Sequence, residues 1–380
     1  MQTFGLCGGQ FFDGTENAPI ATDVLLEDGR IAAMGNGVGK EAEVQLDLRG
    51  RFFSAGWVDV HTHLFHRPGY LGLSAVPFSL QQGVTYVIDQ GSAGADCFAS
   101  FSQQILKPLP MGHKAFLNCS KIGIPLSFLD GPGELADRAN LDEGALLSAY
   151  EAQKEEGEVI GLKIRLTPSV CPDNPLGALQ TASRWAKDLH LPLEVHPNFA
   201  PISTEALLSC LKPGDIYTHT YHPSPVGILD EKGAVKDCVW RAREQGIFFD
   251  LAHGVSSLSF PVMEQAFAQG FYPDFISTDL HNGNFCGPVY SLAHTMTKCL
   301  AFGLSLPQII HRVTAAPVHG FGLKDKVVAP SVGDWADFTV FHLENTPQTL
   351  SDGRGHTHTA QQQIVVDATF YHQQWYPTHP

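Results

Sequence analysis

The sequence has no stretch approaching the roughly 18 consecutive apolar residues of a membrane span. Its first residues, MQTFGLCGGQFFDG, lack a basic segment followed by a long apolar run, so they do not predict a secretory signal. The eight cysteines include no Cys-x-x-Cys pair and no dense disulfide spacing, which predicts reduced thiols. We therefore expect a cytoplasmic protein that has no contact with a membrane.

Clusters of lysine and arginine are also missing. The chain has 24 basic and 39 acidic residues, a formal charge of −15, and no basic patch that could follow a phosphate backbone. Nucleic acid is therefore not expected as a partner, and a small-molecule substrate is. The oligomeric state stays open, a homo-oligomer included.

The two ends of the chain have the short alternating pattern of β-strands, and the longer middle segment has a different pattern. Residues 1–54 contain short alternating runs, with Asp28-Gly29 as a strong hairpin-turn signal. The same texture returns in residues 327–380. We expect the two ends to form one small β-sandwich domain.

Residues 55–326 alternate short β-branched runs with helix-length segments, the pattern of repeated βα units. Ser203 is expected to cap one of these helices. Eight units over about 270 residues match the size of a (β/α)8, or TIM, barrel. The expected strands begin near residues 56, 84, 115, 159, 192, 215, 247 and 274.

Most of these strands end in a side chain that can bind a metal ion, which is unusual for segments buried on both faces. In such barrels the C-terminal ends of the strands form the active site. We therefore expect the candidate ligands to lie together on one rim. They are His61, His63, Lys163, His196, His219 and Asp279.

The spacing of these residues follows the repeat. His61 and Lys163 are 102 residues apart, which is three units, and His196 follows Lys163 by 33, which is one unit. His219 comes 23 residues later and Asp279 another 60, which are one short unit and two units. Any single histidine could be structural, but the whole set at whole numbers of units predicts a metal site.

A second His-Thr-His, formed by His356 and His358, occurs in the segment SDGRGHTHTA. It lies in a glycine-rich stretch outside the expected barrel, so we do not expect it to bind a metal.

Several of these segments carry a resemblance. WVDVHTH, GLKIR, EVHP, THTYH and STDLH resemble the amidohydrolase superfamily. GSAGAD (91–96), LNCSKIG (117–123) and the long segment 277–303 resemble its dihydroorotase-like deacetylase branch. The resemblance implies two divalent metal ions bridged by a carbamylated lysine. It assigns His61, His63 and Asp279 to the first ion, His196 and His219 to the second, and Lys163 to the bridge.

The chemistry of this set is coherent. Burial favours a neutral lysine amine, which can add CO2 and become an anionic oxygen donor spanning two cations. Nitrogen and oxygen ligands favour zinc, with manganese, iron or cobalt as alternatives. The metals would acidify a bridging water to give a hydroxide nucleophile. We expect Asp279 to take the proton from that water and pass it to the leaving group.

Substrate contacts are less clearly marked. Arg165 shares the inward face with Lys163 and could hold a carboxylate, although a structural salt bridge explains it equally well. His253, after the seventh strand, is a second candidate contact, and Glu194 could orient a ligand.

We expect hydrolysis of an amide or ester bond, with deacylation of a small N-acyl or O-acyl acid as the leading hypothesis. A cyclic amidase of the dihydroorotase type is one alternative, but Phe65 stands where that enzyme has an arginine. An aminohydrolase is another, but Lys163 argues against it. A silent barrel scaffold is the non-enzyme alternative, since the fold alone does not determine function.

Overall fold

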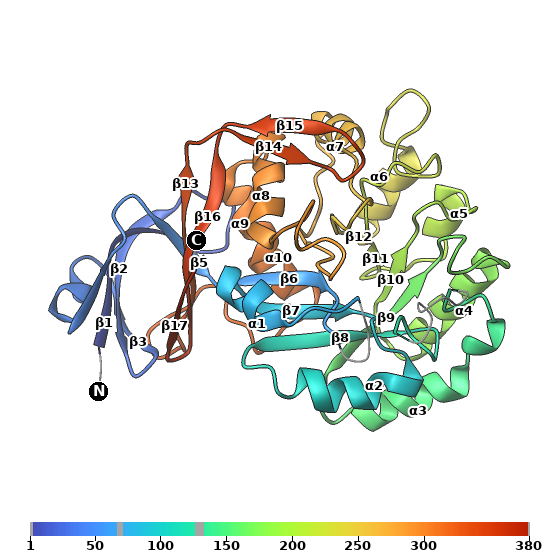
Figure 1. Ribbon diagram of the computed structural model, residues 1–380, viewed down its shortest axis with the longest axis horizontal. Coiled ribbons are helices and arrows are strands. Elements are labelled where there is room, and N and C mark those ends of the chain that lie inside the picture. Colours follow the sequence, from blue (N-terminus) through green and yellow to red (C-terminus); the bar gives the residue numbers. More distant parts are fainter. Residues whose placement is uncertain (1–2, 67–70, 126–132, 379–380) are drawn as a thin grey trace.

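The two ends of the chain pair with each other in one eight-stranded sheet (Figure 1). The computed structural model describes residues 3–66, 71–125 and 133–378. The strand order is β17-β16-β13-β5-β1-β2-β3, with β4 beside β1. The bounds are β1 Thr3–Phe12, β2 Ile20–Glu27, β3 Arg30–Met34, β4 Val44–Asp47, β5 Phe52–Ala55, β13 Asp337–Glu344, β16 Gln363–Tyr371 and β17 Gln374–Pro377.

The hairpin predicted at Asp28-Gly29 joins β2 to β3. Both residues have positive φ, 50° and 77°, as the tight two-residue turn requires. Phe53 and Phe338 come from opposite ends of the chain and pack together in the core of this sheet. The described residues thus show that the ends combine, whereas the sandwich arrangement and the domain boundaries stay predictions.

A second sheet of seven parallel strands lies beside the first, in the order β12-β11-β10-β9-β8-β7-β6. Seven of the eight expected barrel strands are therefore present. Their bounds are β6 Trp57–Thr62, β7 Val84–Gln90, β8 Gly112–Asn118, β9 Val159–Arg165, β10 Leu193–His196, β11 Ile216–Tyr217 and β12 Phe248–Phe249.

The eighth expected strand, starting at residue 274, is not a regular strand. Its backbone turns at Asp279, where φ is +52°, so an extended ladder cannot continue through that residue. Two isolated parallel bridges nevertheless join this segment to both edges of the sheet, from Phe275 to Asp250 and from Leu280 to Thr62. The segment closes the ring with bridges in place of a full ladder.

Helices follow most of these strands and cover the outside of the sheet (Figure 1). The predicted cap is confirmed, because the Ser203 side chain accepts a hydrogen bond from the Ala206 amide at the start of α5. None of the helices in the described ranges is both long and apolar enough to cross a bilayer. The α-helices are α1 Ala75–Phe78, α2 Ala95–Phe101, α3 Glu143–Gln153, α4 Pro175–Asp188, α5 Thr204–Leu208, α6 Asp237–Glu244, α7 Phe260–Ala268, α8 Leu292–Ala301, α9 Leu306–Val313 and α10 Ala315–Gly320. The short 3-10 helices are η1 Val38–Glu41, η2 Leu80–Gln82 and η4 Arg138–Asn140, and η3 Ser102–Leu106 is a π-helix.

A two-stranded hairpin, β14 Gln348–Ser351 and β15 Thr357–Ala360, reaches from the terminal sheet towards the barrel helices (Figure 1). The Asp352 carboxylate accepts a hydrogen bond from the Phe260 amide, 3.1 Å away, at the start of α7. The second His-Thr-His lies in this hairpin.

Candidate metal centre

The six candidate ligands line one cavity of about 420 Å³. His61 and His63 lie on β6 and its extension, and Lys163 and His196 lie near the carboxyl ends of β9 and β10. His219 follows β11 by two residues, and Asp279 lies in the irregular eighth segment. Parallel strands of a barrel end on the same rim, which explains how residues up to 218 positions apart meet. All six side chains are largely withdrawn from solvent.

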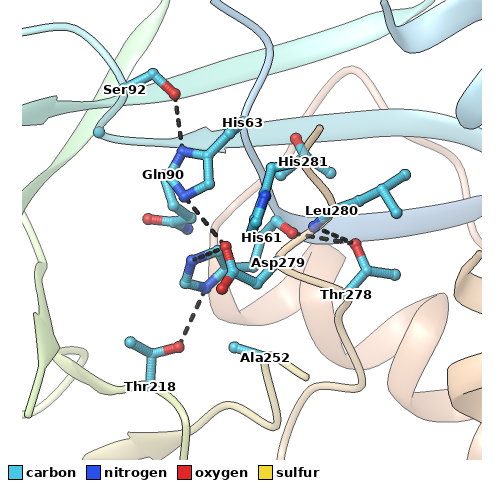
Figure 2. Close-up of polar contacts among 12 residues, drawn as sticks. His61, His63, Gln90, Ser92, Thr218, Ala252, Thr278, Asp279, Leu280 and His281 are labelled. Carbon is cyan, nitrogen blue, oxygen red and sulfur yellow. Dashed lines mark hydrogen bonds and ion pairs between the residues drawn. The ribbon is translucent and has the colours of Figure 1, made fainter. Parts of the chain in front are cut away.

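Asp279 lies close to three of the candidate histidines, two of which, His61 and His63, are seen beside it in Figure 2. Its Oδ1 is 3.1 Å from Nε2 of His63 and 3.6 Å from Nε2 of His61. Its Oδ2 is 4.0 Å from Nε2 of His219, and the His219 and His196 rings are 4.3 Å apart between centroids. His61, His63 and Asp279 offer ligand atoms that all lie within 4.8 Å of one another, close enough to share one ion.

His63 is held in the tautomer that a metal ligand needs. Its Nδ1 is 2.8 Å from Ser92 Oγ, and the Ser92 hydroxyl donates to Asp89, also at 2.8 Å. Because the serine proton is directed to the carboxylate, Ser92 Oγ accepts from Nδ1–H of His63. The lone pair of His63 is therefore on Nε2, which faces Asp279 (Figure 2).

His61 is held in the same tautomer as His63, but by different hydrogen-bond partners. Its Nδ1 lies 3.1 Å from Glu194 and 3.3 Å from Asp250, and carboxylates accept hydrogen bonds. Thr218 Oγ1, 3.1 Å away, donates its own proton to Asp250. Nδ1 of His61 therefore carries the proton, and Nε2 presents its lone pair to the cavity. Partners of this kind fix and strengthen metal-binding histidines.

His219 completes the pattern. Its Nδ1 donates to the Ala252 carbonyl at 2.7 Å, which leaves the lone pair on Nε2. Three of the four candidate histidine ligands thus present an unprotonated Nε2 to one space. The group formed by His61, Glu194 and Asp250 could also reach one ion, but both carboxylates are fully buried and engage Nδ1 of His61. We interpret them as orienting partners.

Lys163 lies against His61, with its Nζ 3.5 Å from Nε2 of that histidine, and forms an ion pair with Glu194. Its stem passes Gly91, where φ is +71° and a Cβ atom would lie only 2.4 Å from the Lys163 Cβ. A larger residue at Gly91 would displace the lysine, so the GSAGAD segment positions this candidate bridge.

The electrostatics of the site favour neutral imidazoles beside an ionised Asp279. Burial lowers the pKa of His61 and His196 well below the ordinary value and that of His219 to about 4. Burial alone would raise the pKa of Asp279, but the neighbouring rings of His63 and His219 bring it below its usual range. Neutral histidine and ionised aspartate are the forms in which these residues bind metals.

The surrounding carboxylates give a second reason to expect cations. Burial raises the pKa of Glu194, and burial together with the nearby Glu194 raises that of Asp250 well above its usual value. One oxygen of Glu194 is buried and makes no hydrogen bond within the described ranges. Divalent ions bound nearby would offset this effect of burial and favour the ionised forms of both carboxyl groups.

The two proposed substrate contacts lie in different environments. Arg165 lines the cavity, and its guanidinium makes paired hydrogen bonds of 2.5 and 2.6 Å with the buried Glu134. The salt-bridge interpretation of Arg165 is therefore realised. His253 is fully buried against Lys298 and is absent from the described residues that line the cavity. Nothing in its position supports a substrate contact.

Several residues beside the ligands were not singled out by the sequence. Asp250 directly follows β12, the same strand-end position that identified the ligands, so the signal was present. His281 follows Asp279 by two residues and also lines the cavity. Ser92 and Thr218 act through hydrogen bonds to ring nitrogens, for which the sequence carries no marker.

Comparisons with known proteins identify the family of this chain. A sequence model of the amidohydrolase family matches residues 52–370. The chain is 34% identical over 337 residues to a deacetylase of Agrobacterium fabrum, covering 88% of this chain and 82% of the relative. It is 32% identical over 346 residues to a deacetylase of Enterococcus faecalis, covering 90% of this chain and 91% of the relative.

Solved structures match over almost the whole chain. A crystal structure of a dihydroorotase has a TM-score of 0.90 at 29% identity and covers 99% of this chain and 98% of its own. A crystal structure of an adenine deaminase has a TM-score of 0.86 at 31% identity, with 99% and 100% covered. At 17% identity, an N-acyl-D-glutamate deacylase from Bordetella bronchiseptica, complexed with zinc and a phosphonate inhibitor, shares the fold with a TM-score of 0.65 and 99% and 97% covered.

Proposed function

The chain belongs to the amidohydrolase family, and on that premise we propose that it removes an acyl group from a small N-acyl or O-acyl acid. Membership makes it a metal-dependent hydrolase of the TIM-barrel fold. The observation that carries the finer proposal is the set of three imidazoles whose Nδ1 protons are engaged and whose Nε2 atoms share one cavity with Lys163 and Asp279. The deacetylases among the relatives favour an acyl group as the part removed.

Two divalent cations fit this donor set. His61, His63 and Asp279 would hold the first, His196 and His219 the second, and carbamylated Lys163 would bridge them. Nitrogen and oxygen donors without thiolate favour zinc, with manganese, iron or cobalt as alternatives. The zinc in the deacylase of the same fold is consistent with that choice.

The bound cations would supply Lewis acidity, polarising the acyl carbonyl and lowering the pKa of the attacking water. Asp279 accepts the proton of that water and passes it to the departing nitrogen or oxygen. Its Oδ2 has room to do so because Gly254 lies beside it, where a Cβ atom would come within 2.7 Å. Glu194 and Asp250 keep the His61 ring aligned during this transfer.

A substrate screen tests this proposal. Zinc-loaded protein should hydrolyse at least one member of a panel that contains both enantiomers of N-acetyl and O-acetyl acids. The activity should disappear on chelation and return when zinc is added. Cyclic amides and aminopurines serve as comparison substrates, because a dihydroorotase and an adenine deaminase are among the structural relatives. Turnover of a cyclic amide or an aminopurine without any deacylation would refute the proposal in favour of the corresponding alternative.

A further inference from the structure

The geometry points to His281 as a catalytic residue that donates a hydrogen bond from Nε2 to the acyl oxygen of the substrate, and not as a metal ligand. This inference deepens the proposed function and rests on it. His281 lies in the same cavity as the ligands, 6.3 Å from the His63 ring between centroids (Figure 2).

The tautomer of His281 is opposite to that of its neighbours. The backbone N–H of Gly283 donates to Nδ1 of His281 at 2.9 Å. A nitrogen that accepts a hydrogen bond carries no proton, so the neutral ring has its proton on Nε2. His63 and His219 have the proton on Nδ1 and a lone pair on Nε2. His281 therefore offers a donor where they offer ligand atoms.

The turn after Asp279 is built to hold this tautomer. Asn284 accepts a hydrogen bond from the His281 amide at 2.9 Å and donates to the Asp279 carbonyl at 2.7 Å. A Cβ atom on Gly283 would lie 2.9 Å from Cε1 of the His281 ring, so a larger residue there would displace the ring. The same turn thus fixes the backbone of both residues.

Among the described residues, the hydrogen bond of the His281 ring is the one that Nδ1 accepts from Gly283, which leaves Nε2 without a partner there. The residue is 9% exposed in the wall of the cavity. The Arg165 guanidinium, which lines the same wall, is engaged by Glu134. A fixed donor in the wall of the reacting space, without a partner among the described residues, suits the stabilisation of a developing oxyanion.

The bonds that form and break in acyl hydrolysis indicate that the Nε2–H of His281 donates to the acyl oxygen. Water attacks the acyl carbon, the π electrons of the carbonyl move to oxygen, and the His281 N–H hydrogen-bonds that oxygen without giving up its proton. The carbonyl then re-forms as the C–N or C–O bond breaks, and the departing atom receives the proton held by Asp279. Neutral His281 cannot supply that proton, because losing it would leave an imidazolate.

Variants at His281 test the donor directly. His281→Phe keeps a ring and removes the donor, whereas His281→Gln can place an N–H near the same point. His358→Phe, in the second His-Thr-His, is the matched control. Removing one oxyanion donor costs about 10²–10³-fold, so we expect that loss in kcat/KM for His281→Phe with unchanged metal content, a recovery of about tenfold in His281→Gln, and no loss in the control.

Leaving-group dependence separates this role from protonation of the departing atom. The loss in His281→Phe should be similar for an N-acetyl substrate and for p-nitrophenyl acetate, whose leaving group needs no proton. A loss confined to the amide, a drop in metal content, or activity within a few-fold of wild type would overturn the inference.

Two measurements remain informative without turnover. Methylphosphonate, a tetrahedral anion, should bind zinc-loaded His281→Phe at least about tenfold more weakly than wild type in calorimetry. Nitrogen NMR of the zinc-loaded protein should show the His281 proton on Nε2. Equal phosphonate binding, or an unprotonated Nε2, would refute the role of His281 even if the substrate screen fails, whereas wild type inactive on every acyl substrate would refute the proposed function alone.

Discussion

The same tripeptide, His-Thr-His, occurs twice in this chain in two different environments. In the first copy His61 and His63 are 1% and 5% exposed and lie at the carboxyl end of a barrel strand. In the second copy the His356 side chain is 51% exposed, and the His358 ring packs against Phe302 with centroids 4.4 Å apart. Only the first copy joins other ligand-type side chains in a group that the described residues could offer to a metal.

The difference lies in what surrounds the rings and not in the motif. Both copies have an acidic partner at Nδ1, Asp250 for His61 at 3.3 Å and Asp352 for His356 at 2.7 Å. The first ring, however, presents its Nε2 to a walled cavity that contains Asp279 and Lys163. An oriented histidine is therefore insufficient for a metal site without converging ligands from other strands.

The largest difference should appear when both histidines of one copy are replaced by alanine and the result is compared with the same replacement in the other copy. His61→Ala/His63→Ala should lose metal and about 10³-fold or more of kcat/KM, because metal ions contribute several kcal/mol to such reactions. His356→Ala/His358→Ala should retain activity within about twofold, as expected for changes far from the reacting atoms. Equal losses in the two double variants would break the comparison.

Asp279→Asn should have the next largest effect, because it keeps the shape and one oxygen donor but removes the charge and the basicity. General acid and base catalysis contributes about 10²–10⁴-fold, so kcat should fall by that order while part of the metal is retained. Steady-state kinetics with metal analysis would check this. A folded, metal-loaded variant with kcat within a few-fold of wild type would leave Asp279 with a structural role only.

The two acidic partners sharpen the comparison. Asp250→Asn should weaken metal binding by about 10–100-fold, because partners that orient a ligand typically contribute that much. Asp352→Asn should leave metal affinity unchanged, although the variant keeps only one of the two oxygens that accept from the backbone amides of Arg354 and Phe260. Competition with a metal indicator measures both affinities, and a similar loss in Asp352→Asn would contradict the distinction.

The smallest effect concerns stability. The His356–Asp352 pair is half exposed on the histidine side, and such pairs contribute about 0–1 kcal/mol. His356→Ala should therefore lower the free energy of unfolding by no more than about 1 kcal/mol in urea denaturation. A loss of several kcal/mol would show that the hairpin depends on this ion pair.

Most of the ligand-type side chains that line the cavity could be predicted, because they occur at strand ends and are spaced by the βα repeat. His61, Lys163 and Asp279 are separated by whole βα units, and parallel strands bring such positions to one rim. The orienting residues Ser92 and Thr218 could not be predicted, since hydroxyls act here through the three-dimensional path of a hydrogen bond.

The fold also has parts that the sequence predicted and parts that it did not. Strands with a strong β-branched pattern were predictable, as was the Asp28-Gly29 turn. The irregular eighth segment was not, because its shape depends on the positive φ of Asp279, a residue that side-chain pattern alone assigns to a strand. The sandwich expected for the ends depends on how one sheet curves, which strand patterns do not specify.

Anomalous diffraction from crystals of active, zinc-loaded protein tests the central claim most directly. We predict about two zinc peaks, one beside His61, His63 and Asp279 and one beside His196 and His219, with density for a carbamate on Lys163 between them. No peak should lie at His356 or His358. An active crystal in which the cavity holds no metal and Lys163 is an unmodified amine would contradict the account.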